Sequence, residues 1–305
     1  MYDYSIFYPS VSSVAKNKLS AMEHIEILLA LGHPHFLISA YDFANLSNEE
    51  KKHVNNKVEE NSIDLLLDSG MYEKAWSGNA VWDSDAYLST IKQINYTHVF
   101  NFDEYINPKD IPIDKIITSV NESDIPNLVP IIHTSKIEDL PTLCREVASL
   151  DNVEMLAMPE RELGNGILEG MYTLIKIREQ LKQLDKYTKI HLLGTGNPLS
   201  LLIYSAFGVD SFDGLDWCQT VADYDTATLH HSLQLDFFAH QSTHGLNEDI
   251  SYVTRLFAHN LEFYTKWMNE INSELSRGSI NEMLRYYLPD SIMDRVLGAY
   301  NEQSY

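Results

Sequence analysis

Short runs of apolar, strand-forming residues alternate along this chain with amphipathic or charged stretches that are long enough to form helices. Seven of these runs predict strands, over residues 36–41, 63–68, 97–103, 128–133, 154–159, 189–194 and 209–213. Such βα repetition is typical of parallel strands covered by helices. The 305 residues, 44% of them hydrophobic, suit one α/β barrel, so we expect a single domain over residues 1–305.

The helical pattern is clearest in two places. Ser47, followed three residues later by Glu50, has the form of an N-terminal capping box. From Asn247 onward the spacing predicts a long helix, with apolar positions at Val253, Phe257, Leu261, Tyr264, Trp267 and Ile271. A second helix is expected around residues 280–288. We expect this C-terminal helical segment, about residues 247–305, to close the outer layer of the barrel.

The charge balance is strongly acidic, because 22 Lys and Arg against 44 Asp and Glu leave a net charge of -22. Proteins that bind nucleic acid normally present a basic surface to the phosphates. Taken alone, the charge therefore argues against a nucleic-acid partner. Net charge describes association and solubility, however, and it leaves room for a local basic strip.

Sequence features that would place the protein outside the cytoplasm are missing. The N-terminus lacks a basic region followed by an apolar stretch, and no apolar run is long enough to span a bilayer. We expect a soluble, cytoplasmic protein without a membrane partner. Cys144 and Cys218 are the only cysteines, and their spacing predicts neither a disulfide framework nor a thiolate zinc cluster.

Acidic residues follow three of the predicted strands directly. Asp68, Asp103 and Asp213 each come after an apolar run, and the carboxyl ends of barrel strands meet at one face. A single Asp after a strand is more often a helix cap than a catalyst. Three at equivalent places favour one shared site, at which Asp216 is a further candidate.

The residues around these strand ends resemble motifs of the tRNA-guanine transglycosylases. Residues 68–72 resemble their Asp-Ser-Gly-Gly-Tyr/Phe segment and residues 102–104 their Phe-Asp-Glu. Residues 193–198 resemble their Met-Gly-x-Gly-x-Pro, and residues 208–213 their Gly-Ile/Val-Asp-x-Phe-Asp. The order and approximate spacing agree from about residue 36 to residue 213, and residues 259–264 resemble the family's C-terminal His-Asn-Leu helix.

The resemblance implies a (β/α)8 TIM barrel with C-terminal helices that exchanges guanine in a nucleic acid for a 7-deazaguanine. Asp213 matches the family's nucleophile, and a carboxylate nucleophile divides one difficult displacement at a sugar carbon into two easier ones. Asp68 matches the carboxylate that exchanges protons with the two bases. Asp103 matches the residue that reads N1–H and the exocyclic amine of guanine.

The same resemblance implies a base-binding slot. Tyr72 and Leu193 match the two residues that sandwich the base. His133 falls where the family has a base-contacting Gln, although it also fits a hydrogen-bonded core histidine, and residues 157–166 fall at the family's Gly-rich loop. Gly194 begins a Gly-Thr-Gly turn that lacks the third glycine of a dinucleotide fingerprint, so we expect close backbone approach to substrate and no required cofactor.

The zinc site of the family is altered here. His259 matches its histidine ligand, but the three closely spaced cysteines are absent, which excludes thiolate zinc. Five residues in the corresponding stretch offer nitrogen and oxygen ligands instead: His230, His231, Asp236, His240 and His244. They also suit surface or core histidines, so the metal remains open.

Other departures indicate which branch of the family the chain resembles. Trp217-Cys218-Gln219 replaces Pro-Thr-Arg after the nucleophile, residues 159–162 replace the Gly-rich loop, and the chain is shorter than typical tRNA enzymes. Such remodelling looks like the DNA-guanine transglycosylases, which insert 7-cyano-7-deazaguanine into DNA. A tRNA-directed enzyme, a non-catalytic base-binding or assembly subunit, and a glycoside hydrolase are the alternatives. Because the acidic chain should bind paired DNA poorly, we expect it to need a partner protein or an opened strand.

Overall fold

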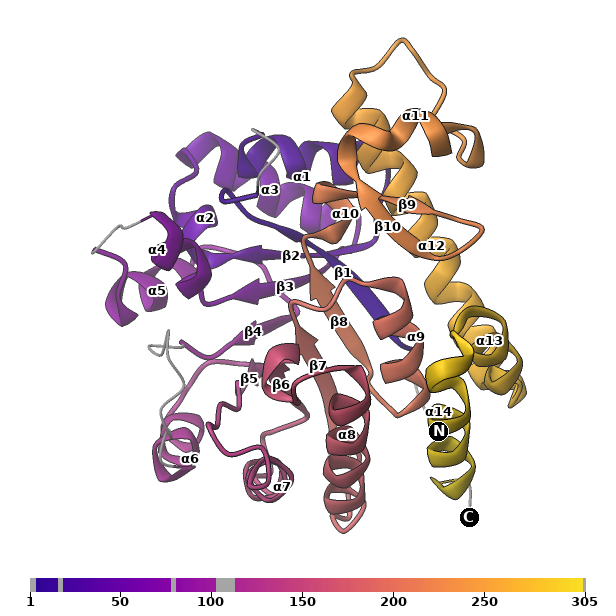
Figure 1. Cartoon of the computed structure of the whole chain (residues 1–305). Helices are drawn as coiled ribbons and strands as arrows, with labels where there is room; N and C mark the ends of the chain where they lie inside the picture. Colours follow the sequence, from indigo (N-terminus) through magenta and orange to yellow (C-terminus); the bar gives the residue numbers. More distant parts are fainter. Residues whose placement is uncertain (1–3, 16–18, 78–80, 103–112, 304–305) are drawn as a thin grey trace.

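Eight parallel strands curl into a nearly closed barrel with helices around it (Figure 1), which confirms the predicted (β/α)8 TIM barrel. The structure is a computed structural model and describes residues 4–15, 19–77, 81–102 and 113–303. The sheet order is β5-β4-β3-β2-β1-β8-β7-β6, and a parallel bridge between Ile131 and Ala157 joins its two ends. The barrel strands are β1 (Ile6–Val11), β2 (His35–Ser39), β3 (Asp64–Asp68), β4 (His98–Phe100), β5 (Leu128–Val129), β6 (Met155–Pro159), β7 (Lys189–Leu193) and β8 (Ser211–Gly214).

Helices follow the strands in the expected alternation. Those inside the barrel sequence are α1 (Ala21–Ala30), α2 (Ala40–Ala44), α3 (Asn48–Glu60), α4 (Met71–Ser77), α5 (Ser84–Ile91), α6 (Ile113–Asn121), α7 (Leu140–Ala148), the 3-10 turn η1 (Glu160–Glu162), α8 (Ile167–Leu181) and α9 (Pro198–Ala206). The capping box is confirmed: the Ser47 hydroxyl accepts the Glu50 N–H at 3.3 Å, and the Glu50 carboxylate accepts the Ser47 N–H at 2.7 Å.

After β8 the chain adds a lobe and a helical segment. The lobe consists of α10 (Asp216–Gln219), β9 (Thr220–Asp223), β10 (Thr228–His231), η2 (Ser232–Gln234), α11 (Leu235–Phe238) and η3 (Ala239–Gln241). The helical segment consists of α12 (Tyr252–Arg277), α13 (Ile280–Tyr287) and α14 (Asp290–Gln303). The long helix and the second helix were predicted, whereas the antiparallel hairpin β9–β10 and the helix α14 were not. Helix α12 packs against α9, α10 and β1, so it completes the outer layer as expected.

The sequence prediction omitted β1, which lies between β2 and β8. Its register places Ser10 beside Leu37 of β2 and Tyr8 beside Asp213 of β8. The apolar run contains Pro9, which has no N–H to donate to a ladder and therefore argues against a central strand. Only tertiary pairing on both sides makes this segment a strand.

Three predicted strands end two or more residues earlier than expected. The first ends at Ser39, whose side chain caps α2 by accepting the Asp42 N–H at 3.0 Å. Strand β4 ends at Phe100, and Asp103 lies outside the described residues. Strand β5 ends at Val129, because Pro130 follows and cannot donate to the ladder.

The core has two layers, which explains the continuous apolar runs in the sequence. Inside the barrel lies a small cluster of inward-facing side chains: Tyr8, Leu37, Leu66, Phe100, Val129, Ile131, Met155 and Ala157. The alternate positions, such as Leu65 and Leu67 of β3, face the helices and belong to a much larger cluster. A strand with apolar side chains on both faces reads as an unbroken hydrophobic run.

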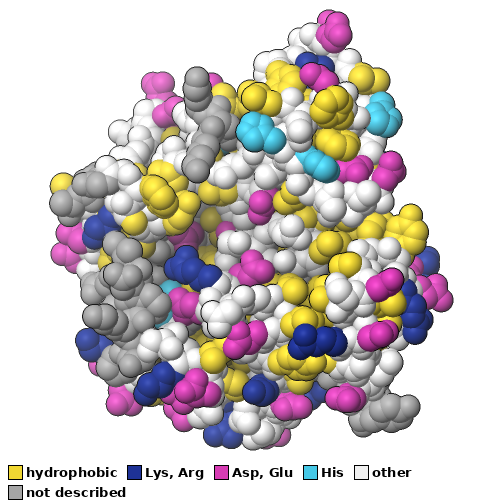
Figure 2. All heavy atoms as spheres, viewed as in Figure 1, with side chains coloured by type: hydrophobic (Ala, Val, Ile, Leu, Met, Phe, Trp, Pro, Cys, Tyr) yellow, Lys and Arg dark blue, Asp and Glu magenta, His cyan; other side chains and the backbone are white. Residues whose placement is uncertain are grey.

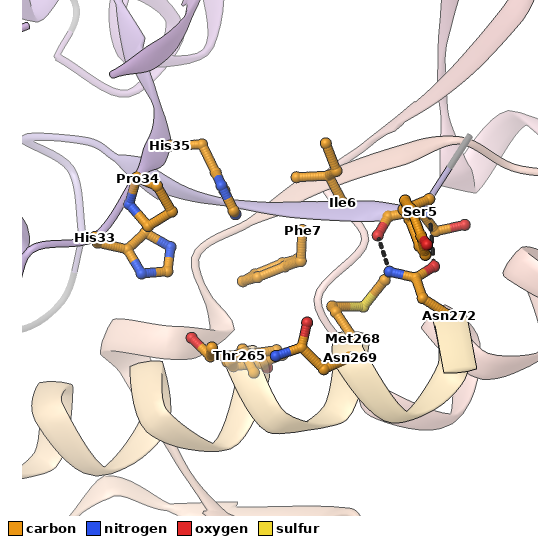
Figure 3. Close-up of a pocket in the computed structure, with 12 residues that line it drawn as sticks. Ser5, Ile6, Phe7, His33, Pro34, His35, Thr265, Met268, Asn269 and Asn272 are labelled. Carbon is orange, nitrogen blue, oxygen red and sulfur yellow. Dashed lines mark hydrogen bonds between the residues drawn. The ribbon is translucent and has the colours of Figure 1, made fainter. Parts of the chain in front are cut away.

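Helix α12 fastens the C-terminal part to the amino end of β1. The Ser5 N–H donates to Asn272 Oδ1 at 2.8 Å, and Asn272 Nδ2 donates back to the Ser5 carbonyl at 2.9 Å (Figure 3). Between these elements lies a hollow of about 320 Å³, which His33 and His35 border. It is at the opposite end of the strands from the acidic strand ends and contains none of the predicted site residues.

None of the helices in the described ranges is both long and apolar enough to cross a membrane.

Asn260 of α12 provides a test of how the lobe is held. Its Oδ1 accepts the Ala222 N–H at 3.0 Å, and its Nδ2 donates to the carbonyls of Trp217 and Thr220, each at 2.7 Å. Asn260→Ala leaves these buried groups unpaired, so we expect the free energy of unfolding to fall by about 2–4 kcal/mol in urea titrations. The matched control is Asn269→Ala on the same helix, where the side chain is exposed and little change is expected. Equal effects of the two variants would contradict this account.

Candidate active site

A cavity of about 750 Å³ opens at the carboxyl ends of the barrel strands. Residues at the ends of β1, β2, β3, β6, β7 and β8 line it, together with residues of α4 and η1. Six of the seven predicted site residues lie there: Asp68, Tyr72, His133, Leu193, Gly194 and Asp213. Asp216 also lines the cavity, whereas Asp103 lies outside the described residues. The structure therefore brings the predicted residues together, and their chemical roles remain predictions.

Asp213 is held by donors from two neighbouring strands. Its Oδ2 accepts the Ser10 hydroxyl of β1 at 2.7 Å, and its Oδ1 lies 3.2 Å from His191 Nε2 of β7. The Gly194 N–H also donates to Oδ1, at 3.1 Å. Only 8% of Asp213 is exposed. These contacts fix the orientation of a nearly buried carboxyl group at the cavity wall.

Gly194 reaches Asp213 because its backbone takes a conformation that other residues avoid. Its φ is +73°, in the left-handed region. Two residues further on, a Cβ at Gly196 would lie 2.3 Å from Asp216 Oδ2, which no side chain permits. The Gly-Thr-Gly turn thus serves to bring the loop after β7 close to the two carboxylates of the β8 region.

Asp216 has a different environment from Asp213. It lies at the start of α10, and burial raises the pKa of its carboxyl group by disfavouring the charged form. A group that tends to stay neutral is a weaker nucleophile than an ionised one. Burial therefore makes Asp216 less suited to attack an electrophilic carbon.

Asp68 stands at the end of β3, where the chain turns sharply into α4. Its Oδ2 accepts the Gly70 N–H at 2.9 Å, an arrangement that tightens the turn. Gly70 has φ of +81°, and a Cβ there would lie only 2.5 Å from the Cβ of Tyr41. The Asp-Ser-Gly sequence is thus required locally to aim Asp68 at the cavity while the loop packs on α2.

Tyr72 and Leu193 come from opposite sides of the barrel mouth. Tyr72 follows β3 and Leu193 ends β7, and these strands lie four places apart in the eight-stranded sheet order. Tyr72 is 48% exposed, and Leu193 is half-buried against the barrel interior. A flat aromatic ligand between them would meet a ring on one side and an aliphatic side chain on the other.

His133 lines the cavity, and a contact with a buried carboxylate holds its ring in place. Its Nδ1 lies 2.7 Å from Glu162 Oε1, and both side chains are buried. The second oxygen of Glu162 accepts the Thr134 N–H at 3.3 Å. The segment over residues 157–166 is therefore the end of β6 followed by the turn η1, which Glu162 ties to the loop after β5.

Sequence reasoning missed Glu73, the residue next to Tyr72. Glu73 is 3% exposed at the wall of the cavity, with Ser12 donating to Oε1 and no hydrogen-bond partner for Oε2 in the described part of the chain. Burial raises the pKa of its carboxyl group to about 8, and the negative charges of Asp42 and Asp68 add to this effect. At neutral pH Glu73 is thus a neutral acid beside Asp68. The only indication of Glu73 in the sequence was its position on the face of α4 that turns toward the cavity.

Two further residues that hold the site were also missed. Ser10 lies on the omitted strand β1, and His191 lies inside β7, where its Nδ1 contacts the Ser211 hydroxyl at 2.8 Å. His191 is fully buried. The only indication of His191 in the sequence was that a polar residue occurs within an apolar strand, two residues before Leu193.

The histidines considered as metal ligands lie in β10, in the segment that follows it, and in α12. Figure 2 shows histidine side chains (cyan) on the lobe at the top of the view, where Figure 1 has β9, β10 and α11. His259 uses both ring nitrogens on protein groups, Nδ1 with the Ser242 hydroxyl at 2.8 Å and Nε2 with the Ala222 carbonyl at 2.7 Å. Across the described ranges, no three His, Cys, Asp or Glu side chains are arranged to hold an ion. The residue that matches the family's histidine ligand therefore fits a structural role better than a zinc site.

Comparison with known proteins adds no family assignment. No protein-family model matches the chain, and a search of curated proteins finds no match either.

Glu73 generates a prediction about stability and pH. In the unfolded chain its carboxyl group titrates near 4.5, whereas in the folded protein it keeps its proton to about 8. Between these values the unfolded state binds fewer protons, so wild-type stability falls as pH rises, by at most about 1.4 kcal/mol per pH unit. Glu73→Gln removes this penalty. The variant should gain stability relative to wild type across that window and gain nothing more above about pH 8.

Urea titrations of both proteins at several pH values measure this difference. Glu50→Gln is the matched control, because hydrogen bonds from Ser47 lower the pKa of the Glu50 carboxyl group. Its stability relative to wild type should therefore fall, not rise, as pH increases through the range in which Glu50 ionises. A Glu73→Gln difference that stays constant with pH would show that Glu73 is ionised in the folded protein.

Proposed function

We propose that the protein is a base-exchange transglycosylase that replaces guanine in DNA with 7-cyano-7-deazaguanine. The observation that carries the proposal is the joint placement of Asp68 and Asp213 on one cavity at the carboxyl ends of the strands. Enzymes with this fold place their chemistry at that face. The ordered motifs at the same strand ends supply the reaction class.

Asp213 would act as the nucleophile. One of its oxygens attacks the anomeric carbon of the sugar, a C–O bond forms, and the bond from that carbon to the guanine nitrogen breaks. The electron pair of the broken bond stays on the guanine nitrogen, which takes a proton from the carboxyl group of Asp68. The hydroxyl of Ser10 and the amide of Gly194 hold Asp213 in position for the attack.

The second half reverses these steps with another base. The incoming 7-deazaguanine gives its ring N–H proton to Asp68, and its nitrogen attacks the sugar carbon. The bond to Asp213 breaks, and the carboxylate is restored. Tyr72 and Leu193, on opposite sides of the mouth, are suited to hold each base in turn by stacking and apolar contact.

The acidic surface bears on the form of the nucleic acid. Asp and Glu side chains are spread across the face seen in Figure 2, and the net charge is -22. Such a field opposes binding of a phosphate backbone, and drawing a paired base out of a duplex costs a few kcal/mol more. We therefore propose that the substrate is an opened or single-stranded stretch of DNA, or a duplex presented by a partner protein.

Asp213→Asn tests the covalent step. The amide is nearly isosteric with the carboxylate but is a poor nucleophile, so incorporation of labelled 7-cyano-7-deazaguanine into single-stranded DNA should fall by roughly a thousandfold or more. A wild-type adduct of DNA and protein, trapped by denaturation and located by mass spectrometry, should map to Asp213 and be absent in the variant.

Asp216→Asn is the matched variant at the neighbouring carboxyl. Loss of exchange in Asp216→Asn with retention in Asp213→Asn would move the nucleophile to Asp216. Exchange with tRNA but not with DNA would assign the protein to the tRNA-directed reaction. Binding of base without exchange in either nucleic acid would identify a non-catalytic base-binding protein, and hydrolysis without base incorporation would identify a glycoside hydrolase.

A further inference from the structure

One positively charged side chain lies at the rim of the acidic cavity. Among the described residues that line the cavity, Arg161 is the only Lys or Arg, against Asp68, Glu73, Asp213 and Asp216. Arg161 is exposed and has no hydrogen bond or ion pair with the part of the chain that the structure describes. In a protein with twice as many acidic as basic side chains, a guanidinium at the mouth of the cavity that no described carboxylate pairs with is unusual.

The turn η1 keeps its own carboxylates away from Arg161. Glu162 is buried and bonded to His133 at 2.7 Å, and Glu160 is half-buried beside the hydroxyl of Tyr204. Because a 3-10 turn has three residues per turn, these three side chains leave it in different directions. The two acids face the protein, and the cation is left at the surface on an anchored turn.

Exposed aromatic rings stand at another part of the rim. Tyr72 and Trp76 lie one helical turn apart on α4, with ring centroids 6.2 Å apart, and both line the cavity. Trp76 is 69% exposed, although a ring of this size is usually buried. Tyr72 has a place in the proposed base slot, whereas Trp76 lies one turn further along the helix and is unused by it.

We propose that Trp76 and Arg161 form a polynucleotide-binding rim, on which Trp76 stacks with a base next to the exchanged one and Arg161 binds a backbone phosphate. The inference rests on the proposed function, and it names the residues that hold the DNA strand outside the base-binding cavity. Base stacking on an exposed aromatic ring and a forked contact from guanidinium to phosphate are the usual interactions of unpaired strands.

The barrel geometry is consistent with this arrangement. Trp76 follows β3 and Arg161 follows β6, and these strands are three places apart once the Ile131–Ala157 bridge closes the ring. A DNA strand that touches both residues must cross the mouth of the cavity. Its flipped base then enters the cavity that Asp68 and Asp213 line.

Arg161→Ala and Trp76→Ala test the rim through binding of a fluorescein-labelled, guanine-containing single-stranded DNA at several salt concentrations. Arg285→Ala and Tyr286→Ala are matched controls, because α13 carries this exposed Arg and this 76% exposed Tyr away from the cavity. Binding of free 7-cyano-7-deazaguanine, which has no phosphate and no neighbouring base, is measured in parallel. Thermal unfolding verifies that each variant is folded.

We expect Trp76→Ala to weaken DNA binding about tenfold, and Arg161→Ala about fivefold at low salt. Arg161→Ala should also reduce the slope of log K against log salt by about 0.7, the value for one phosphate contact on a single strand. In both variants the loss for DNA should exceed the loss for the free base at least about threefold. The two α13 variants should bind DNA like wild type.

The proposed rim is contradicted if Arg161→Ala and Trp76→Ala bind DNA as tightly as their α13 controls, even if wild type performs the exchange. An equal loss of affinity for DNA and for free base would also overturn it, because it would place the defect in the cavity. Failure of the proposed function has a different signature: wild type binds single-stranded DNA through these residues but incorporates no labelled base.

Discussion

The position of β1 between β2 and β8 is the constraint on which the rest of the structure depends. The first strand pairs with the second and with the last, so the start of the barrel sequence closes the sheet that its end completes. This pairing brings Ser10 to Asp213, across 203 residues of sequence, and lets the backbone of Ser5 bond to Asn272 of α12. Without it, the carboxyl ends of the strands would not form a ring, and the cavity would have no continuous wall.

The acidic side chains that line the cavity lie in different environments. Asp213 faces neutral donors from β1 and β7, whereas Glu73 is buried beside other acids and keeps its proton. Repulsion among nearby carboxylates is relieved when one of them is neutral, so the protonated Glu73 allows Asp68 to stand beside it at lower cost. Arg161 remains outside this arrangement, at the rim, because both neighbouring glutamates turn inward.

Hydrogen bonds between protein groups hold the lobe after β8 to the barrel. His259 and Asn260 on α12 bind backbone groups of β9 and of the segment around α10, so they hold the lobe to the barrel through protein hydrogen bonds alone. The burial of His259 lowers the pKa of its imidazole, which keeps the ring neutral and able to accept as well as donate. These contacts fix the position of α10, and with it the position of Asp216 at the cavity wall.

The sequence alone determined the βα rhythm, the capping box at Ser47 and the order of the acidic strand ends, because these depend on local periodicity and on neighbours a few residues away. Since the carboxyl ends of parallel strands share one face, it also predicted that Asp68 and Asp213 would meet at one cavity. Tertiary structure decided the rest: that a segment with Pro9 forms β1, that Glu73 stays protonated, and that Arg161 is left without a partner in the described chain. Each of these depends on the burial and charge of residues that are distant in sequence, and no local pattern carries that information.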